Sequence, residues 1–187
     1  MKKPLAIAAA LALLLTIGGS AALLGGKVPE RPRLASGNRP VWAEVAWPFP
    51  LDQWGRGLAF RCKPSDCGSD INLYLRAKIG FCNCASEIDD DEVDRVGDTG
   101  LVGGERTALG AGNPLGVHGM QGRSRGYKIR RSVTAKSALT VAFHNRCDMI
   151  VATAILGNND PALQREAVLD FLNSDLVLRW AETTLGL

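Results

Sequence analysis

The stretch SALTVAFHNRCDMIVATAILG, residues Ser137–Gly157, decides the fold. It holds two apolar runs, and the polar segment His144–Asp148 separates them. Apolar runs of this length on either side of a polar break are typical of a hairpin in a sheet core. The sequence therefore predicts two adjacent antiparallel strands here, with the rest of the domain assembled around them.

Two other segments alternate as strands do. In INLYLRAKIGF (Ile71–Phe81), apolar residues occupy every second position from Ile71 to Ile79. The positions between them hold Asn72, Tyr74, Arg76 and Lys78. This alternation predicts a strand with one buried and one solvated face. The segment GYKIRR (Gly126–Arg131) alternates in the same way.

A short helix is predicted over SEIDDDEVDRVG (Ser86–Gly97), with Ser86 as its N-cap, acidic residues in the first turn and Gly97 at its end. The acidic run from Asp89 lacks the ligand spacing and central glycine of a calcium loop, so we interpret it as a solvated helix start. The basic run between Arg123 and Arg131 is interpreted as a solvated sheet face, with contact to anionic lipid headgroups as the alternative.

The C-terminal region predicts a helix. Asp160-Pro161 is an N-cap followed by proline at the first helical position, and a break is expected near Asn173-Ser174. The apolar stripe, which includes Phe171 and Trp180, has to lie on the sheet. The predicted fold class is α+β: an antiparallel sheet with a C-terminal helix packed on one face, in one domain after an N-terminal apolar helix.

The N-terminus predicts export. The uncharged stretch Pro4–Gly26 has 23 residues, which as a helix would span about 35 Å, enough to cross a bilayer. Residues 1–26 are therefore predicted to be a transmembrane anchor or a cleaved signal peptide. Residues 27–40 are predicted to be a Pro-rich tether and residues 41–187 the α+β domain. The predicted location is the inner membrane with the domain in the periplasm, or secretion to the periplasm.

The charge balance argues against nucleic acid as a partner. The chain has 187 residues and a formal net charge of +3, of which Lys2 and Lys3 supply two. The rest is close to neutral, whereas a nucleic-acid binder needs a basic face to neutralise phosphates. The expected partners are the membrane, through the N-terminal helix, and a protein that the sequence does not identify.

The five cysteines are Cys62, Cys67, Cys82, Cys84 and Cys147. An exported protein meets an oxidising compartment, so the first four are predicted to form disulfides. Cys62 with Cys84 and Cys67 with Cys82 is one nested solution, and Cys62 with Cys82 and Cys67 with Cys84 is the other. Cys147 is predicted to be the free thiol, although it could replace one member of these pairs. The alternative is a copper or zinc site made by the same first four cysteines, which their spacing disfavours.

No catalytic set is predicted. His144 lies three residues before Cys147, and a thiolate needs a partner base, so a thiol redox or cysteine enzyme stays a second alternative. His118 and Met120 share one face of a predicted strand, as copper ligands can, but two residues are too few to carry a copper site. No cofactor is expected.

One resemblance adds to this picture. The segment WPFPLDQWGRGLAFRC, together with RAKIGFCNC, resembles a pattern of uncharacterised single-anchor exported proteins of Gram-negative bacteria. The resemblance implies export and brings no activity, cofactor or binding residue with it. The first segment holds Trp47 and Trp54 and follows Trp42; all three tryptophans are expected to pack onto the domain as core or lid. The predicted function is a periplasmic accessory or binding module without catalytic activity.

Overall fold

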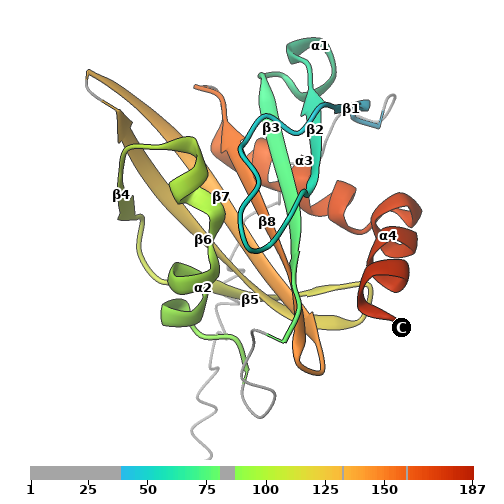
Figure 1. Ribbon diagram of the computed structural model, residues 1–187. Coiled ribbons are helices and arrows are strands. Elements are labelled where there is room, and N and C mark those ends of the chain that lie inside the picture. Colours follow the sequence, from blue (N-terminus) through green and yellow to red (C-terminus); the bar gives the residue numbers. More distant parts are fainter. Residues whose placement is uncertain (1–38, 81–86, 132, 159) are drawn as a thin grey trace, which may run out of the picture. The chain divides into compact units, whose positions relative to one another are not determined.

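The core of the molecule is an antiparallel sheet (Figure 1). The computed structural model describes residues 39–80, 87–131, 133–158 and 160–187, and these include eight strands. The strands are β1 (Trp42–Val45), β2 (Leu58–Cys62), β3 (Ile71–Lys78), β4 (Glu105–Ala108), β5 (Asn113–Val117), β6 (Met120–Arg131), β7 (Thr134–Asn145) and β8 (Asp148–Leu156). Their order in the sheet is β1-β2-β3-β8-β7-β6-β4, and β5 also pairs with β6.

The predicted hairpin lies at the centre of this sheet. Strands β7 and β8 pair in antiparallel register from Ser137 opposite Leu156 to Asn145 opposite Asp148. Only Arg146 and Cys147 form the turn, and Arg146 adopts a positive φ of 56°, as tight hairpin turns require. The central position of the hairpin explains its apolar composition, because both faces of these strands are covered.

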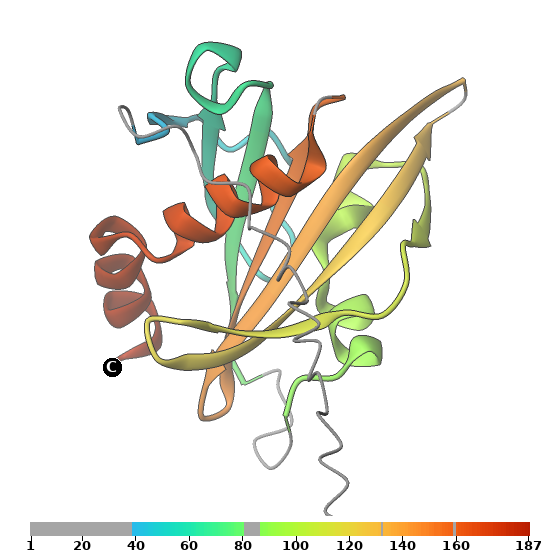
Figure 2. The same cartoon turned by 180° about the vertical axis from the view of Figure 1, so that it is seen from behind.

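Helices cover both faces of the sheet (Figures 1 and 2). The helices are α1 (Pro64–Cys67), α2 (Asp90–Val96), the 3-10 helix η1 (Asp98–Val102), α3 (Pro161–Leu172) and α4 (Asp175–Leu185). Helices α3 and α4 pack on one face, in a core that contains Leu73, Phe143 and Leu172. Helix α2 packs on the other face, where Val93 and Val96 contact residues of β7 and β8. The α+β fold class with a C-terminal helical layer is confirmed.

The second helical layer corrects the prediction for β3. Its apolar face is buried as expected, and Ile71, Leu73 and Leu75 are fully inaccessible. The opposite face was predicted to be solvated, yet Arg76 is only 2% and Lys78 only 5% exposed. Period-two alternation identifies a strand, but it does not reveal that charged residues on the polar face are themselves covered by another element.

The helix starts follow local hydrogen bonding. Helix α2 begins after Asp89, whose side chain accepts a hydrogen bond from the Glu92 amide at 2.7 Å. The predicted N-cap, Ser86, lies outside the described residues. Asp160 caps α3 ahead of Pro161, as predicted. The break between α3 and α4 also lies where expected, with Ser174 as the N-cap of α4.

The apolar stripe of the C-terminal helices lies on the sheet, as predicted. Leu172, Val177 and Ala181 are fully buried, whereas Phe171 and Trp180 are partly buried and pack at the margin of the same core. Among the described residues, no helix has the length and apolar character needed to span a membrane. The predicted anchor (1–26) and most of the predicted tether lie outside these residues, so their boundaries stay predictions.

Candidate functional site

The acidic run of α2 and the basic run of β6 pair with each other. Asp90 pairs with Arg123 and accepts a hydrogen bond from the Gly112 amide at 3.0 Å. Asp94 accepts hydrogen bonds from Arg125 at 2.9 Å and from the Tyr127 hydroxyl at 2.5 Å. The prediction of solvated faces is therefore wrong for these paired residues, whereas the rest of the two runs includes exposed side chains, namely Asp89, Asp91, Lys128, Arg130 and Arg131. The acids repeat every four residues along a helix and their partners every two along a strand, so both sets face each other.

A second charged group is buried between β3 and η1. Arg76 donates from Nε and Nη2 to the Asp98 carboxylate at 3.0 and 2.6 Å, and Lys78 Nζ donates to the same carboxylate at 3.0 Å. Arg76 Nη1 also donates to both carboxylate oxygens of Asp52, each at 2.7 Å. Two positive and two negative charges thus neutralise each other. They hold η1 and the Asp52 loop against β3.

Two tryptophans cover this buried group. The guanidinium of Arg76 lies 5.8 Å from the Trp47 ring centroid, and the ammonium of Lys78 lies 5.3 Å from that of Trp54. Trp47 can approach the strands because position 57 is glycine: a Cβ on Gly57 would lie 2.7 Å from the Trp47 ring. These two tryptophans therefore act as the lid that the sequence predicted. A hollow of about 360 Å³ opens beside the group.

In both charged groups, the neighbouring residues stabilise each side chain in the charge state that it usually has at neutral pH. The hydrogen bond from Arg123 holds the pKa of Asp90 below its usual value, and that from Arg76 does the same for the pKa of Asp52. Burial, followed by the bond to Asp94, raises the pKa of Tyr127 far above its usual value. A group that transfers protons efficiently near neutral pH needs a pKa near 7. Each of these shifts moves away from 7, so we assign the two groups a structural role.

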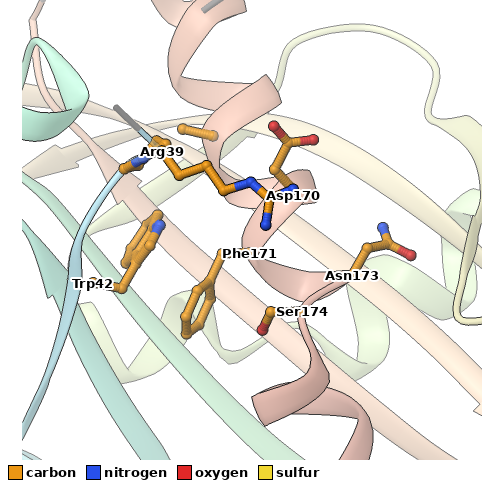
Figure 3. Close-up of a pocket in the computed structure, with 8 residues that line it drawn as sticks. Arg39, Trp42, Asp170, Phe171, Asn173 and Ser174 are labelled. Carbon is orange, nitrogen blue, oxygen red and sulfur yellow. The ribbon is translucent and has the colours of Figure 1, made fainter. Parts of the chain in front are cut away.

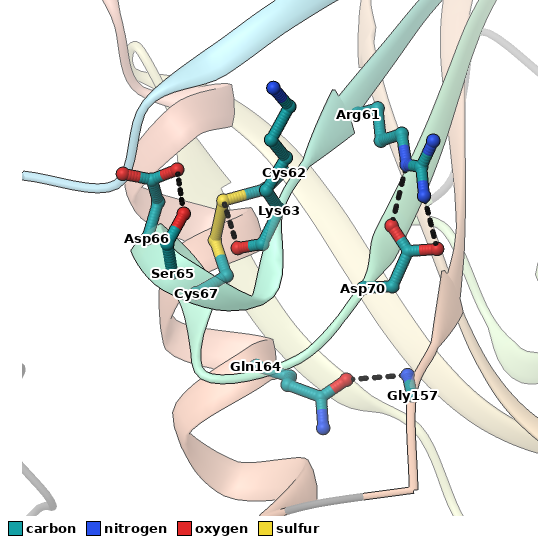
Figure 4. Close-up of a disulfide and its surroundings, with 9 residues drawn as sticks. All are labelled: Arg61, Cys62, Lys63, Ser65, Asp66, Cys67, Asp70, Gly157 and Gln164. Atoms are coloured by element: carbon teal, nitrogen blue, oxygen red, sulfur yellow. Dashed lines mark hydrogen bonds and ion pairs between the residues drawn. A yellow bond between two sulfur atoms is a disulfide. The ribbon is translucent and has the colours of Figure 1, made fainter.

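The disulfide between Cys62 and Cys67 differs from both predicted pairings (Figure 4). It joins the last residue of β2 to the last residue of α1, in the connection from β2 to β3. Cys62 and Cys67 are thus disulfide-bonded as predicted, but to each other, since a single turn of helix brings them within reach. Two of the four side chains of the alternative metal site are consequently joined in this structure.

Cys147 is disulfide-bonded, so the prediction of a free thiol at this position is wrong. With Cys62 and Cys67 paired together, the remaining cysteines of the chain are Cys82 and Cys84, which lie outside the described residues. The chain leading to them ends beside the turn that holds Cys147: the Gly80 amide donates to Asp148 Oδ1 at 2.7 Å.

A tryptic map of unreduced protein, made in an oxidising compartment, should separate these arrangements. Lys63 precedes Pro64, so trypsin leaves Cys62 and Cys67 in one peptide, which should be two hydrogens lighter than its reduced form. The peptide that starts at Cys147 should be linked to the peptide 79–95. A link between Cys62 and peptide 79–95 would contradict the structure. Loss of the Cys62–Cys67 disulfide, which closes a short loop, should lower the free energy of unfolding by about 2 kcal/mol.

The two histidines make structural contacts. His118, in the β5–β6 turn, donates through Nε2 to the Ser174 carbonyl at 3.0 Å, and its amide donates to Asn173 Oδ1. Met120 is buried in the main core, so the two residues proposed as copper ligands have separate roles. His144 Nδ1 lies 3.1 Å from the Arg146 carbonyl oxygen. Cys147 cannot supply a free thiolate to His144, because it is in a disulfide.

A cavity between β1 and α3 is the candidate functional site (Figure 3). Its volume is about 370 Å³, and we call it the aromatic cavity. It is lined by Arg39, Pro40, Trp42, Ala167, Asp170, Phe171, Asn173 and Ser174. The rings of Trp42 and Phe171 stack with centroids 4.8 Å apart and planes at 28°. The site thus has an apolar, aromatic wall and a polar rim, which is the usual composition of a ligand pocket.

Opposite charges at the rim of the aromatic cavity are available to a ligand. Figure 3 shows the Arg39 side chain extending toward Asp170. Within the described part of the chain, neither residue takes part in an ion pair. This distinguishes the cavity from the buried group around Asp98, whose charges already satisfy one another. Sequence reasoning missed the site because its two sides, β1 and α3, are about 120 residues apart.

Comparisons with known proteins identify no family. No protein-family model matches the sequence, and no curated protein matches it either. Twelve chains of known structure are similar in part, including the following three. The protein of unknown function PA94 from Pseudomonas aeruginosa has 9% sequence identity and a TM-score of 0.41, over 75% of this chain and 85% of its own.

The other two similar structures come from different organisms. CyanoP, the cyanobacterial PsbP of Synechocystis sp. PCC 6803, has 13% identity and a TM-score of 0.45, over 70% of this chain and 78% of its own. LpqN, which is involved in cell envelope biogenesis of Mycobacterium tuberculosis, has 10% identity and a TM-score of 0.39, over 71% and 82%. At these values the similarities carry no functional argument.

Proposed function

We propose that this chain is a membrane-tethered or secreted binding module of the periplasm without catalytic activity, and that it binds an extended peptide segment of a protein partner. The observation that carries the proposal is the aromatic cavity beside an open sheet edge. In the described residues β1 pairs with β2 alone, so one edge of β1 has no strand beside it.

The open edge and the cavity are suited to the same ligand. A peptide that adds a strand to β1 would form main-chain hydrogen bonds along Trp42–Val45, as in β-augmentation. Trp42 belongs both to that strand and to the cavity wall, so an apolar side chain of the peptide could stack there. Arg39 and Asp170 would then select the charge of neighbouring peptide residues.

The periplasmic location is supported by the cysteine chemistry. Cys62, Cys67 and Cys147 are all disulfide-bonded, and structural disulfides persist in oxidising compartments. The apolar run before residue 27 supplies the export signal or anchor that such a location requires.

The test is selection of peptides from a random display library on the full chain purified from the periplasm, followed by affinity measurements. Asp170→Arg reverses an exposed charge at the cavity rim and should change the affinity of selected peptides about tenfold, the effect of about 1.4 kcal/mol. Glu182→Arg makes the same charge change on the exposed face of α4 and should leave the affinity unaltered.

A second arm tests the strand addition. Methylation of alternate backbone nitrogens of a selected peptide removes the hydrogen bonds that a strand makes to one neighbour, and it should abolish binding. Peptides that bind the Asp170→Arg and Glu182→Arg variants equally well would show that the aromatic cavity is not the site. Selection of no peptide at all would defeat the proposed function.

A further inference from the structure

The hairpin of β6 and β7 extends beyond the body of the domain (Figures 1 and 2). The two strands stay paired to their last residues, where Arg131 lies opposite Thr134. We call residues 128–131 and 133–136 the hairpin arm. Strands β6 and β7 lie in the half of the sheet away from β1, where β4 is the edge strand, so the hairpin arm is independent of the aromatic cavity and of the function proposed for it.

The hairpin arm is strongly basic. Its four cations, Lys128, Arg130, Arg131 and Lys136, are all exposed. None of them forms an ion pair with any residue that the structure describes, in contrast to Arg123 and Arg125 lower on the same strand. Glu105, on β4 opposite Arg130, is a carboxylate at this end of the sheet. Because the four cations outnumber this carboxylate, the tip of the hairpin arm is electropositive.

The register places these cations on both sides of the hairpin arm. Directly paired residues of an antiparallel ladder point to the same face. Lys136 pairs with Ile129, and so shares a face with Arg131; Lys128 and Arg130 point to the other face. A surface that met one side of the arm would contact only half of this charge. An anionic surface approached by the tip would meet all of it.

The tip carries one fully exposed aliphatic side chain. Val133 is 99% exposed, so contact with an apolar layer would remove its whole side chain from water. A small hollow of about 90 Å³ lies beside the hairpin arm, lined by Arg131, Thr134 and Lys136 together with Val102, Gly103, Ile129 and Ile155. The Thr134 hydroxyl donates to the Arg131 carbonyl at 3.0 Å, so the guanidinium of Arg131 and the ammonium of Lys136 are the donors available to a phosphate group.

We propose that the hairpin arm docks tip-first onto an anionic phospholipid surface, with the side chain of Val133 at the interface and headgroup phosphates on the four cations. The combination of an apolar apex and flanking cations fits a lipid interface better than a soluble polyanion, which offers no apolar layer. A membrane anchor in the N-terminal segment would keep a lipid surface close to the domain. If Pro4–Gly26 is an anchor, residues 27–38 span at most about 43 Å when fully extended.

The experiment uses the full chain reconstituted into vesicles of phosphatidylcholine, with or without 30% phosphatidylglycerol. A photoreactive benzophenone residue replaces Val133, and the fraction of protein crosslinked to lipid is measured. The control carries the same residue at Leu51, which is 67% exposed in the loop between β1 and β2. Position 133 should label phosphatidylglycerol vesicles strongly, and the Leu51 position should not.

Charge variants make the test specific. Each Lys or Arg near an anionic surface changes membrane affinity about fivefold. Arg131→Ala with Lys136→Ala should therefore lower labelling from position 133 by up to about 25-fold, whereas Lys63→Ala with Arg179→Ala, two exposed cations elsewhere, should not change it. High salt should have the same effect as the arm variant.

Three outcomes would overturn the proposal. The first is equal labelling of neutral and anionic vesicles, which would mean that charge does not direct the contact. The second is equal labelling from Val133 and Leu51. The third is retention of the chain on an immobilised oligonucleotide through the same cations without lipid labelling, which would assign the hairpin arm to a soluble polyanion.

Discussion

Asp98→Asn is expected to lower the free energy of unfolding by about 3–5 kcal/mol, the usual cost of breaking a buried ion pair from one side. Asp98 is 6% exposed, and it accepts three hydrogen bonds from Arg76 and Lys78, which are equally inaccessible. The variant leaves two cations with the single, partly exposed carboxylate of Asp52. Denaturant titration followed by circular dichroism measures the loss.

Asp70→Asn is the matched control for that experiment. Asp70 accepts two hydrogen bonds from Arg61, at 2.7 and 2.9 Å, in the same two-point geometry (Figure 4). Its side chain is 41% exposed and that of Arg61 50%, so water replaces the lost partner. The expected cost is below about 1 kcal/mol. Similar losses in the two variants would show that the group around Asp98 is hydrated.

Leu172→Ala should cost about 2–5 kcal/mol, because it empties a fully buried site where α3 meets the sheet. Leu176→Ala, one turn further along the chain at 42% exposure, removes the same atoms and should change stability by less than about 0.5 kcal/mol. Thermal or denaturant unfolding of both variants gives the comparison. Equal stabilities would mean that α3 and α4 do not pack on the sheet as described.

Much of the fold follows from short-range patterns in the sequence. The β7–β8 hairpin, the strand from Ile71 and the capped start at Asp160 each rest on residues within one element or its ends. Such patterns predict the structure correctly because they depend on residues within the element and not on what packs against it. The prediction for β3 went wrong where a second layer intervened, since alternation shows which residues share a face and not what covers that face.

The charged groups were missed although a signal for part of them exists in the sequence. Asp90 and Asp94 lie four residues apart, the helical interval, and Arg123 and Arg125 lie two apart, the strand interval. Each run alone is typical of a solvated face. Only when the helical and the strand interval are considered together do they suggest that the acidic and basic side chains face each other. The pairing of Cys62 with Cys67 was missed because both predicted solutions paired these residues with Cys82 and Cys84, and the sequence analysis predicted no helical turn between Cys62 and Cys67.

The two edges of the sheet have a consequence for self-association. An unpaired strand edge is a template on which another copy of the same sheet can add, which is the first step of aggregation. Here the outer strands β1 and β4 have only four residues each, and β5 carries Pro114, which lacks a backbone donor. Glu44 and Glu105 add like charges along β1 and β4. These edges disfavour stacking between identical molecules, yet a short stretch of a different, flexible chain could still pair along one of them.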